Sequence, residues 1–140
     1  MKLITVRDIM TPADRIAMIS PYATVRELIN LMNTKGVRSV IVERTSENDA
    51  YGIVTYTNIL QAIYSNDGDM DLLNVYDVAT KPMVQIVPDL DIRYAAQLMI
   101  NQKIKHLSVT WEGRLTGVIS MTDIARVLME EAKEGLESSE

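Results

Sequence analysis

The chain has 140 residues, of which 47% are hydrophobic, and it carries a formal net charge of −5. A chain of this length and apolar content can build one globular domain or two very small ones that share a core. The absence of cysteine excludes disulfides, thiolate metal sites and cysteine nucleophiles, and the negative charge argues against a broad basic face for nucleic acid.

The first residues, MKLITVRDIMTP, lack the sustained apolar stretch of a secretory signal, and no apolar run in the chain exceeds four residues. A bilayer-spanning helix needs about 20 predominantly apolar residues. The sequence therefore predicts a soluble cytoplasmic protein that does not span a membrane.

The first half of the chain predicts a short strand, a helix, two further strands and a second helix. A β-prone run at residues 16–19 precedes a stretch with apolar residues at helical spacing, and Thr24 with Glu27 forms a capping box at the start of this helix. Two more β-prone runs follow at 40–43 and 51–55, and the next stretch again has a helical pattern. The apolar stripe of the first helix consists of Val25, Leu28, Ile29, Leu31 and Met32.

The second half of the chain predicts the same order of elements. The polar segment SNDGDMDLLN, residues 65–74, joins it to the first half. β-prone runs occur at residues 84–87, 107–111 and 115–120, and a helical pattern lies between the first two. The apolar stripe of this helix consists of Ile92, Ala95, Ala96, Leu98 and Met99.

The two halves are copies of one unit, because GIVTYTNIL at residues 52–60 returns as GVISMTDIA at residues 117–125, and the match extends upstream with small shifts in offset. Each copy reads β-α-β-β-α, which predicts an α/β (α+β) fold. About 60 residues alone bury too little apolar area to be stable, so we expect the copies to pack together. The expected boundaries are 1–64 for the first repeat, 65–74 for the linker, 75–130 for the second repeat and 131–140 for an acidic C-terminal tail.

Each duplicated phrase predicts a corner where a buried strand passes into a helix. It runs through a glycine, two branched apolar residues, a hydroxyl and two variable residues to Asn58 or Asp123. A hydroxyl three residues before an acid, such as Ser120 before Asp123, is also typical of a capped helix N-terminus. A carboxylate at a helix start has two oxygens that can accept from the vicinal hydroxyls of a ribose. The pattern therefore fits helix capping alone and ribose binding, and the two are compatible.

GVRSVIV and KIKHLSV, followed by GIVTYTN and GVISMTD, resemble the motifs of the CBS (cystathionine beta-synthase) domain family, in which two repeats form a Bateman module. The resemblance runs from residue 6 to residue 130 and leaves no room in the chain for an attached catalytic domain, as in stand-alone prokaryotic members. It implies tandem repeats packed with pseudo-twofold symmetry and two clefts between them. In family members these clefts commonly bind AMP, ADP, ATP or S-adenosylmethionine.

The resemblance implies ligand contacts at the corner of each copy. In the second copy, Asp123 matches the family's ribose-binding Asp, Ser120 and Thr122 match the hydroxyls beside it, and Met121 lies close enough in sequence to touch a ligand. The corresponding positions of the first copy are Thr55, Thr57 and Asn58.

Asn58 departs from the family pattern. An amide offers one acceptor oxygen and an uncharged hydrogen bond, whereas a carboxylate offers two oxygens and charge-assisted bonds about twice as strong. We therefore expect the first cleft to be the weaker site.

Basic residues at the start of the second strand supply phosphate contacts in the family, and this chain has Arg38, Lys105 and His106 there. The resemblance implies that all three converge on the pseudo-twofold axis. A solvated charge at a helix-to-strand turn is the alternative for Arg38 and Lys105. His106 is the only histidine, and its surroundings in the sequence lack the pattern of a triad or a metal site.

The sequence thus predicts a regulatory module, not an enzyme, that binds an adenine nucleotide or another adenosyl compound between its repeats. It requires no cofactor or metal and reports its ligand to an effector protein of unknown identity by a change in conformation or assembly. A homodimer is expected because the apolar excess on short helices needs a partner surface. The alternative is a structural dimerisation or protein-interaction module with vestigial clefts.

Overall fold

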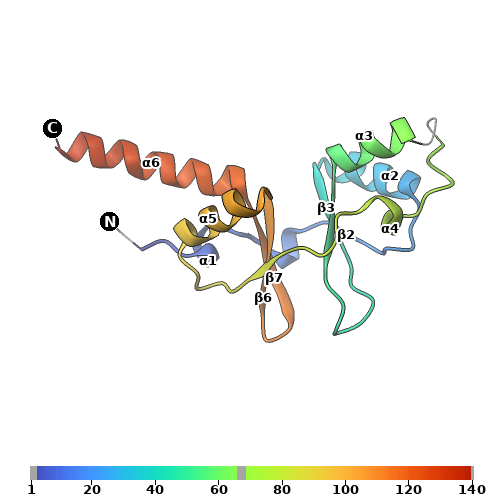
Figure 1. Ribbon diagram of the computed structural model, residues 1–140, viewed down its shortest axis with the longest axis horizontal. Helices are drawn as coiled ribbons and strands as arrows, with labels where there is room; N and C mark the ends of the chain where they lie inside the picture. The colour runs from blue at the N-terminus through green and yellow to red at the C-terminus, as the bar shows by residue number, and fades with distance from the viewer. Residues whose placement is uncertain (1–2, 66–68, 140) are drawn as a thin grey trace. The chain divides into compact units, whose positions relative to one another are not determined.

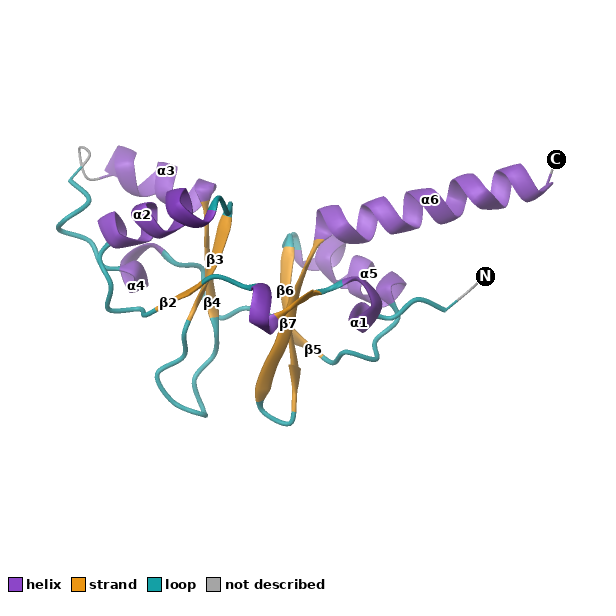
Figure 2. Ribbon diagram, turned by 180° about the vertical axis from the view of Figure 1, so that it is seen from behind, coloured by secondary structure: helices purple, strands orange, loops and turns teal. Residues whose placement is uncertain are grey.

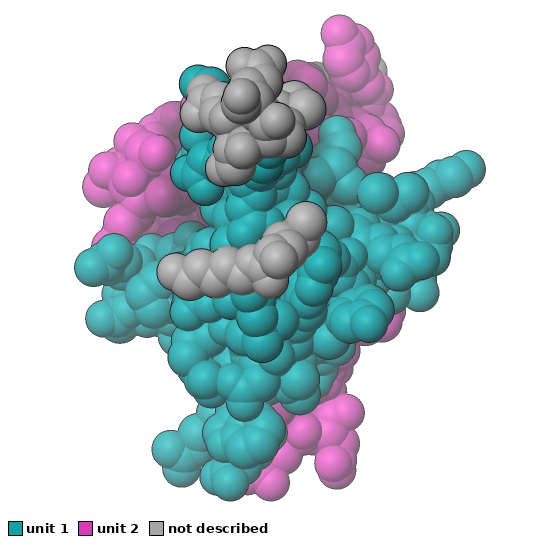
Figure 3. All heavy atoms as spheres, turned by 90° about the vertical axis from the view of Figure 1, so that its left-hand side faces the viewer, with its two compact units in different colours: residues 1–15, 84–140 teal, residues 16–83 magenta. Residues whose placement is uncertain are grey.

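The computed structural model describes residues 3–65 and 69–139. Two compact units make up the chain, and Figure 3 distinguishes them by colour. Unit 1 comprises residues 1–15 and 84–140, and unit 2 comprises residues 16–83.

The described part of unit 2 forms a three-stranded sheet with helices (Figure 1). Its elements in chain order are β2 (Met18–Ile19), α2 (Val25–Lys35), β3 (Ser39–Val42), β4 (Gly52–Thr55), α3 (Tyr56–Ser65) and α4 (Val75–Val78). β3 lies at the centre, parallel to β2 and antiparallel to β4. The predicted capping box of α2 is confirmed, because Thr24 Oγ1 accepts from the Glu27 amide at 3.1 Å and Glu27 Oε2 accepts from the Thr24 amide at 3.3 Å.

The described part of unit 1 forms a four-stranded sheet with helices (Figure 2). Its elements are α1 (Val6–Ile9), β1 (Thr11–Pro12), the 3-10 turn η1 (Ala13–Arg15), β5 (Gln85–Ile86), α5 (Ile92–Gln102), β6 (His106–Trp111), β7 (Arg114–Ser120) and α6 (Met121–Ser139). The strand order is β1-β7-β6-β5, and only β5 and β6 run parallel within this described sheet. The predicted β-α-β-β-α order is therefore confirmed in each unit.

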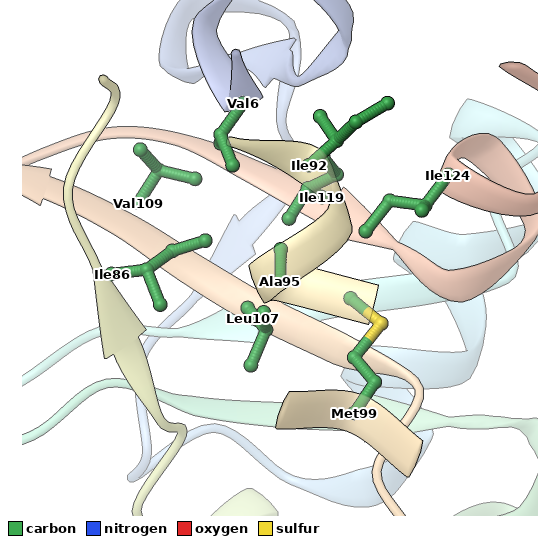
Figure 4. Packing of buried hydrophobic residues seen from close by; sticks show 9 residues of the cluster. All are labelled: Val6, Ile86, Ile92, Ala95, Met99, Leu107, Val109, Ile119 and Ile124. Carbon is green, nitrogen blue, oxygen red and sulfur yellow. The ribbon is translucent and has the colours of Figure 1, made fainter. Parts of the chain in front are cut away.

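The core of each unit lies between its sheet and its helices. In Figure 4, side chains of α5 and the start of α6 point toward the strands of unit 1. The buried cluster of unit 1 consists of Val6, Ile86, Ile92, Ala95, Met99, Leu107, Val109, Ile119 and Ile124. The buried cluster of unit 2 consists of Leu28, Met32, Val40, Val42, Val54 and Val75.

The compact units do not coincide with the repeats of the sequence, because each unit takes a short segment from the other repeat. Val6 of the first repeat is fully buried in the core of unit 1, where its amide donates to the Leu90 carbonyl at 2.8 Å. Val75 of the second repeat is fully buried in unit 2, where its amide donates to the Ala23 carbonyl at 2.8 Å. The packing boundaries therefore fall near residues 15 and 83 rather than within the predicted linker.

The described residues cover the expected linker and the expected C-terminal tail in part. Residues 66–68 of the predicted linker lie outside the described residues. α6 continues through the predicted acidic tail to Ser139, so this part of the tail belongs to the helix (Figure 1). Within the described ranges, no helix combines the length and the apolar character needed to cross a bilayer.

The glycines of the two duplicated phrases allow a neighbouring backbone to approach the strand. A Cβ at Gly117 in β7 would lie 2.6 Å from the Thr11 carbonyl oxygen, which belongs to the paired strand β1. A Cβ at Gly52 in β4 would lie 3.2 Å from the Thr80 carbonyl oxygen. Because the same crossing occurs in both units, the repeated glycine has a packing role.

Candidate functional site

The corner of unit 1 brings the end of β7, the start of α6 and the start of β6 together. Ser120 Oγ accepts from the Asp123 amide at 3.2 Å, which satisfies one of the free N–H groups at the helix start. The Met121 amide donates to the Lys105 carbonyl at 2.8 Å, and His106 pairs with Ser120 across the two strands. The basic residues of the KIKHL motif are thus held beside the hydroxyls of the GVISMTD motif.

A pocket of about 620 Å³ opens at this corner. Five of the residues predicted from the sequence line it, namely Lys105, His106, Ser120, Met121 and Thr122. Four further lining residues were not predicted, namely Ala125, Arg126, Met129 and Glu130. They extend the pocket along the first turns of α6. Ala125 and Arg126 follow Met121 or Thr122 by three or four residues, and Met129 and Glu130 follow Ala125 and Arg126 by four, so this helical spacing is the sequence signal that could have identified them.

Asp123 does not line this pocket, but its carboxylate is accessible beside it. The side chain of Asp123 is 34% exposed, and the Arg126 guanidinium lies 3.8 Å from its Oδ1. Among the described residues this loose ion pair is the one polar contact of the carboxylate that we find. The Asp123 oxygens therefore retain acceptor capacity for a ligand.

The charges around the pocket alter the titration of its histidine. His106 is half-buried, and burial lowers its pKa below the ordinary value of 6.5. The negative charge of Asp123 raises this pKa and the positive charge of Lys105 lowers it, and both effects are smaller than that of burial. His106 is therefore mostly neutral at pH 7.

The corner of unit 2 has a different chemistry, because the side chain of Asn58 is fully engaged. Its Oδ1 accepts from the amide and the hydroxyl of Thr55 at 2.8 and 3.1 Å. Its Nδ2 donates to the Val78 carbonyl at 2.9 Å and to Thr80 Oγ1 at 3.1 Å. A small pocket of about 170 Å³ adjoins Asn58, on the side of Leu73 and Val78.

The remaining predicted site residues belong to unit 2. Thr57 is exposed in the first turn of α3, and Arg38 is exposed directly before β3. The convergence of Arg38 with Lys105 and His106 at one ligand stays a prediction, because Arg38 and the other two residues belong to different units.

Comparison with known proteins matches both halves of the chain. The family model described as "CBS domain" matches residues 6–65 and residues 75–130. An uncharacterized protein of Methanopyrus kandleri is 26% identical over 109 residues, which cover 77% of this chain and 55% of that protein. A mitochondrial CBS domain-containing protein of Arabidopsis thaliana is 26% identical over 81% of this chain and 57% of its own length. The chain thus spans little more than half the length of these two relatives.

Solved structures share the fold. The hexameric CBS-CP12 protein from bloom-forming cyanobacteria is 34% identical, with a TM-score of 0.78 over 88% of this chain and 70% of that one. The CBS domain of the bacterial CNNM/CorC family Mg²⁺ transporter in complex with ATP is 24% identical, with a TM-score of 0.74 over 86% of this chain and 84% of that one. At this lower identity the second likeness concerns the fold alone.

Proposed function

Because the chain belongs to the CBS domain family, we propose that it is a regulatory module that binds an adenine nucleotide or a related adenosyl compound at the pocket of unit 1. It performs no covalent chemistry. Binding favours one conformation or assembly over another, and an effector protein responds to the change in population.

The observation that carries the proposal is the combination of cations and an accessible carboxylate at one corner. Lys105, His106 and Arg126 line the pocket, and the Asp123 carboxylate lies beside it with one loose contact among the described residues. An ammonium, an imidazolium and a guanidinium suit phosphate oxygens, and a carboxylate suits the two hydroxyls of a ribose. A nucleotide presents both groups together.

A solved structure with the same fold indicates which ligands to compare first. The CBS domain of the CNNM/CorC transporter was solved in complex with ATP. ATP and AMP share the ribose and differ in phosphate charge, so they are the first two ligands to compare.

A thermal-shift screen against AMP, ADP, ATP, S-adenosylmethionine and NAD tests the proposal. A ligand at a hundredfold excess over its dissociation constant stabilises the folded state by about 2.7 kcal/mol, which is readily visible as a higher melting temperature. We expect at least one adenosyl compound to give this shift. Flat curves for all five at millimolar concentration would contradict nucleotide sensing and favour the interaction-only function below.

A pair of lysine variants assigns the effect to the pocket. Lys105→Ala removes a cation that lines the pocket and should weaken binding of the phosphorylated ligand about tenfold or more. Lys133→Ala removes the same charge from the exposed face of α6, away from the pocket lining, and should leave binding unchanged. Equal affinity of the two variants would contradict a phosphate site at Lys105.

A second candidate function, dimerisation or protein interaction, is favoured by the surface of α3. Its ten residues include no charged side chain, and Tyr56, Leu60 and Tyr64 are 54%, 56% and 85% exposed. These three residues are four apart and therefore lie on one face of the helix. An isologous contact sets like side chains near one another, so an uncharged face suits self-association.

We propose on these grounds that the protein is a homodimer and that α3 takes part in the contact. Light scattering during size-exclusion chromatography should give twice the chain mass of 15.7 kDa. Leu60→Glu should produce monomers, whereas Gln61→Glu introduces the same charge at the next residue, outside the stripe, and should not. A wild-type monomer at every concentration would overturn the dimer and leave nucleotide binding to be decided by the thermal-shift screen.

A further inference from the structure

We propose that Asn58 is a latch that closes the corner of unit 2 to ligands, so that each chain binds one ligand, at unit 1. The number of ligands rests on the proposed function, whereas the latch is a structural statement that stands without it. The two parts are tested by different measurements below.

The hydrogen bonds of Asn58 use the whole capacity of its amide. A primary amide has one oxygen with two lone pairs and one nitrogen with two protons. Thr55 supplies both donors to the oxygen, and Val78 and Thr80 supply both acceptors for the nitrogen. The four distances lie between 2.8 and 3.1 Å, so each is a normal hydrogen bond. No acceptor or donor remains for the hydroxyls of a ribose.

The bonds also fasten two parts of unit 2 that are far apart in sequence. Thr55 ends β4, and Asn58 lies in the first turn of α3. Val78 and Thr80 belong to the segment that unit 2 takes from the second repeat. This segment pairs with β4 through an antiparallel bridge between Ile53 and Thr80. The Asn58 side chain hydrogen-bonds to the same segment at the start of α3.

An aspartate could not make this latch, because two of its four bonds require donors. A carboxylate at position 58 would direct its negative charge at the Val78 carbonyl oxygen, which is also an acceptor. This explains why the sequence departs from aspartate here, and it predicts that Asn58→Asp damages unit 2 instead of restoring a ligand site.

Unit 1 has the same backbone frame without the latch. Thr11 pairs with Val118 in β7, as Thr80 pairs with Ile53 in β4. The residue at the corner is Asp123, which has no proton to donate when ionised and meets only the Arg126 guanidinium, at 3.8 Å, among the described side chains. The choice between amide and carboxylate at this one position therefore separates a closed corner from an open one.

A reciprocal exchange of the two residues tests the proposal, with melting temperature and calorimetric stoichiometry as the two readouts. AMP and ATP are the probes. The wild type should bind one ligand per chain. Asn58→Asp should lower the melting temperature by roughly 3–8 °C and leave the stoichiometry at one. Asp123→Asn should lose at least tenfold in affinity without a fall in melting temperature, because the carboxylate that it replaces has only the 3.8 Å contact with Arg126 among the described side chains.

Gln61→Glu is the matched control for the latch. It makes the same change from amide to carboxylate on the exposed surface of α3, one turn after Asn58, and should leave the melting temperature within about 1 °C of the wild type. If Asn58→Asp melts like Gln61→Glu, the latch is refuted. Two ligands per wild-type chain, or a second site gained in Asn58→Asp, would overturn the closed corner. No binding of either probe would overturn the one-ligand statement, while the two melting temperatures still decide the latch and the five-compound thermal-shift screen still decides the proposed function.

Discussion

Replacing Gly117 with alanine should destabilise the protein far more than the same change at Gly52, although both glycines occupy the first position of the duplicated phrase. At Gly117 the new methyl group would lie 2.6 Å from the Thr11 carbonyl oxygen and 2.7 Å from Met10 Sδ. At Gly52 the nearest atom is the Thr80 carbonyl oxygen at 3.2 Å. Neither glycine has a positive φ, so backbone strain does not contribute to the difference.

The magnitude follows from what has to move. Added volume in a packed core costs about 1–3 kcal/mol, and the upper end applies at Gly117 because the obstacle includes backbone that no side-chain rotation can relieve. β1 must shift away from β7, which loosens the pairs of Thr11 with Val118 and Pro12 with Gly117. At Gly52 a displacement of a few tenths of an ångström suffices. The loss of glycine's freedom in the unfolded chain offsets about 0.4–1 kcal/mol of that cost.

Urea unfolding followed by circular dichroism measures the two changes under one condition. The net loss of about 2–2.6 kcal/mol lowers the midpoint by roughly 0.7–2.6 M, and we expect this for Gly117→Ala and less than a third of it for Gly52→Ala. Gly135→Ala serves as the control, because nothing lies within 4 Å of the new methyl group and alanine favours the helix. Equal midpoints for the Gly117 and Gly52 variants would refute the close crossing of β1 over β7.

Two further predictions concern single positions of unit 1. Lys103 ends α5 in the left-handed conformation, with φ of 56°, at the position where the first repeat has Gly36. Lys103→Gly should therefore raise the free energy of unfolding by roughly 0.5–1 kcal/mol, as measured by thermal melts. A free energy of unfolding below that of the wild type would contradict the left-handed cap. The pKa of His106 is lowered mainly by burial, and an anion bound beside it should raise that pKa, so that the imidazole takes up a proton on binding. ATP affinity measured by calorimetry should therefore rise as the pH falls from 8 through 6.5. His106→Gln should remove this part of the pH dependence, and an identical profile for the variant would show that His106 does not meet the phosphate. Without ligand the sign is reversed: the unfolded chain binds the His106 proton more readily, so its contribution to stability is present above pH 6.5 and declines below it.

The periodic parts of the fold could be predicted because they are long enough to show a pattern. The apolar stripes of α2 and α5 each extend over two helical turns. The β-prone runs that follow each of these helices coincide with β3 and β4 or with β6 and β7 within one or two residues. α1 and α4 have four residues each, too few for a helical period, and they were not predicted as helices.

The exchange of segments between repeats could not be predicted from the repeat itself. At an offset of 69 residues, Asp8, Ile9 and Thr11 match Asp77, Val78 and Thr80. This match shows that both copies have such a segment, but it does not indicate which unit each segment packs on. The hydrogen bonds from the Arg7 amide to the Pro88 carbonyl and from the Tyr76 amide to the Pro21 carbonyl supply that information. Contacts of this kind depend on tertiary packing and leave no local pattern in the sequence.

At position 58 the sequence predicted one property of the side chain and missed another. Comparison of the two copies identified Asn58 as a departure, and amide chemistry indicated a weaker acceptor. The positive role of the amide became visible only with Val78 and Thr80 beside it, 20 and 22 residues further along the chain. Similarly, Arg126 and Met129 were missed because they lie outside the duplicated phrase, and only their helical spacing from Thr122 and Ala125 connects them with the pocket.

The most direct test of the account is calorimetric titration of wild-type protein and Asp123→Asn with AMP and with ATP, with circular dichroism to verify that both proteins are folded. Loss of a charge-assisted hydrogen bond of roughly 1.5–3 kcal/mol corresponds to about a tenfold to hundredfold loss of affinity, and we expect this loss for whichever nucleotide binds. If folded Asp123→Asn binds that nucleotide as tightly as the wild type, Asp123 acts in the structure of the helix start alone, and the ligand site proposed for unit 1 is wrong.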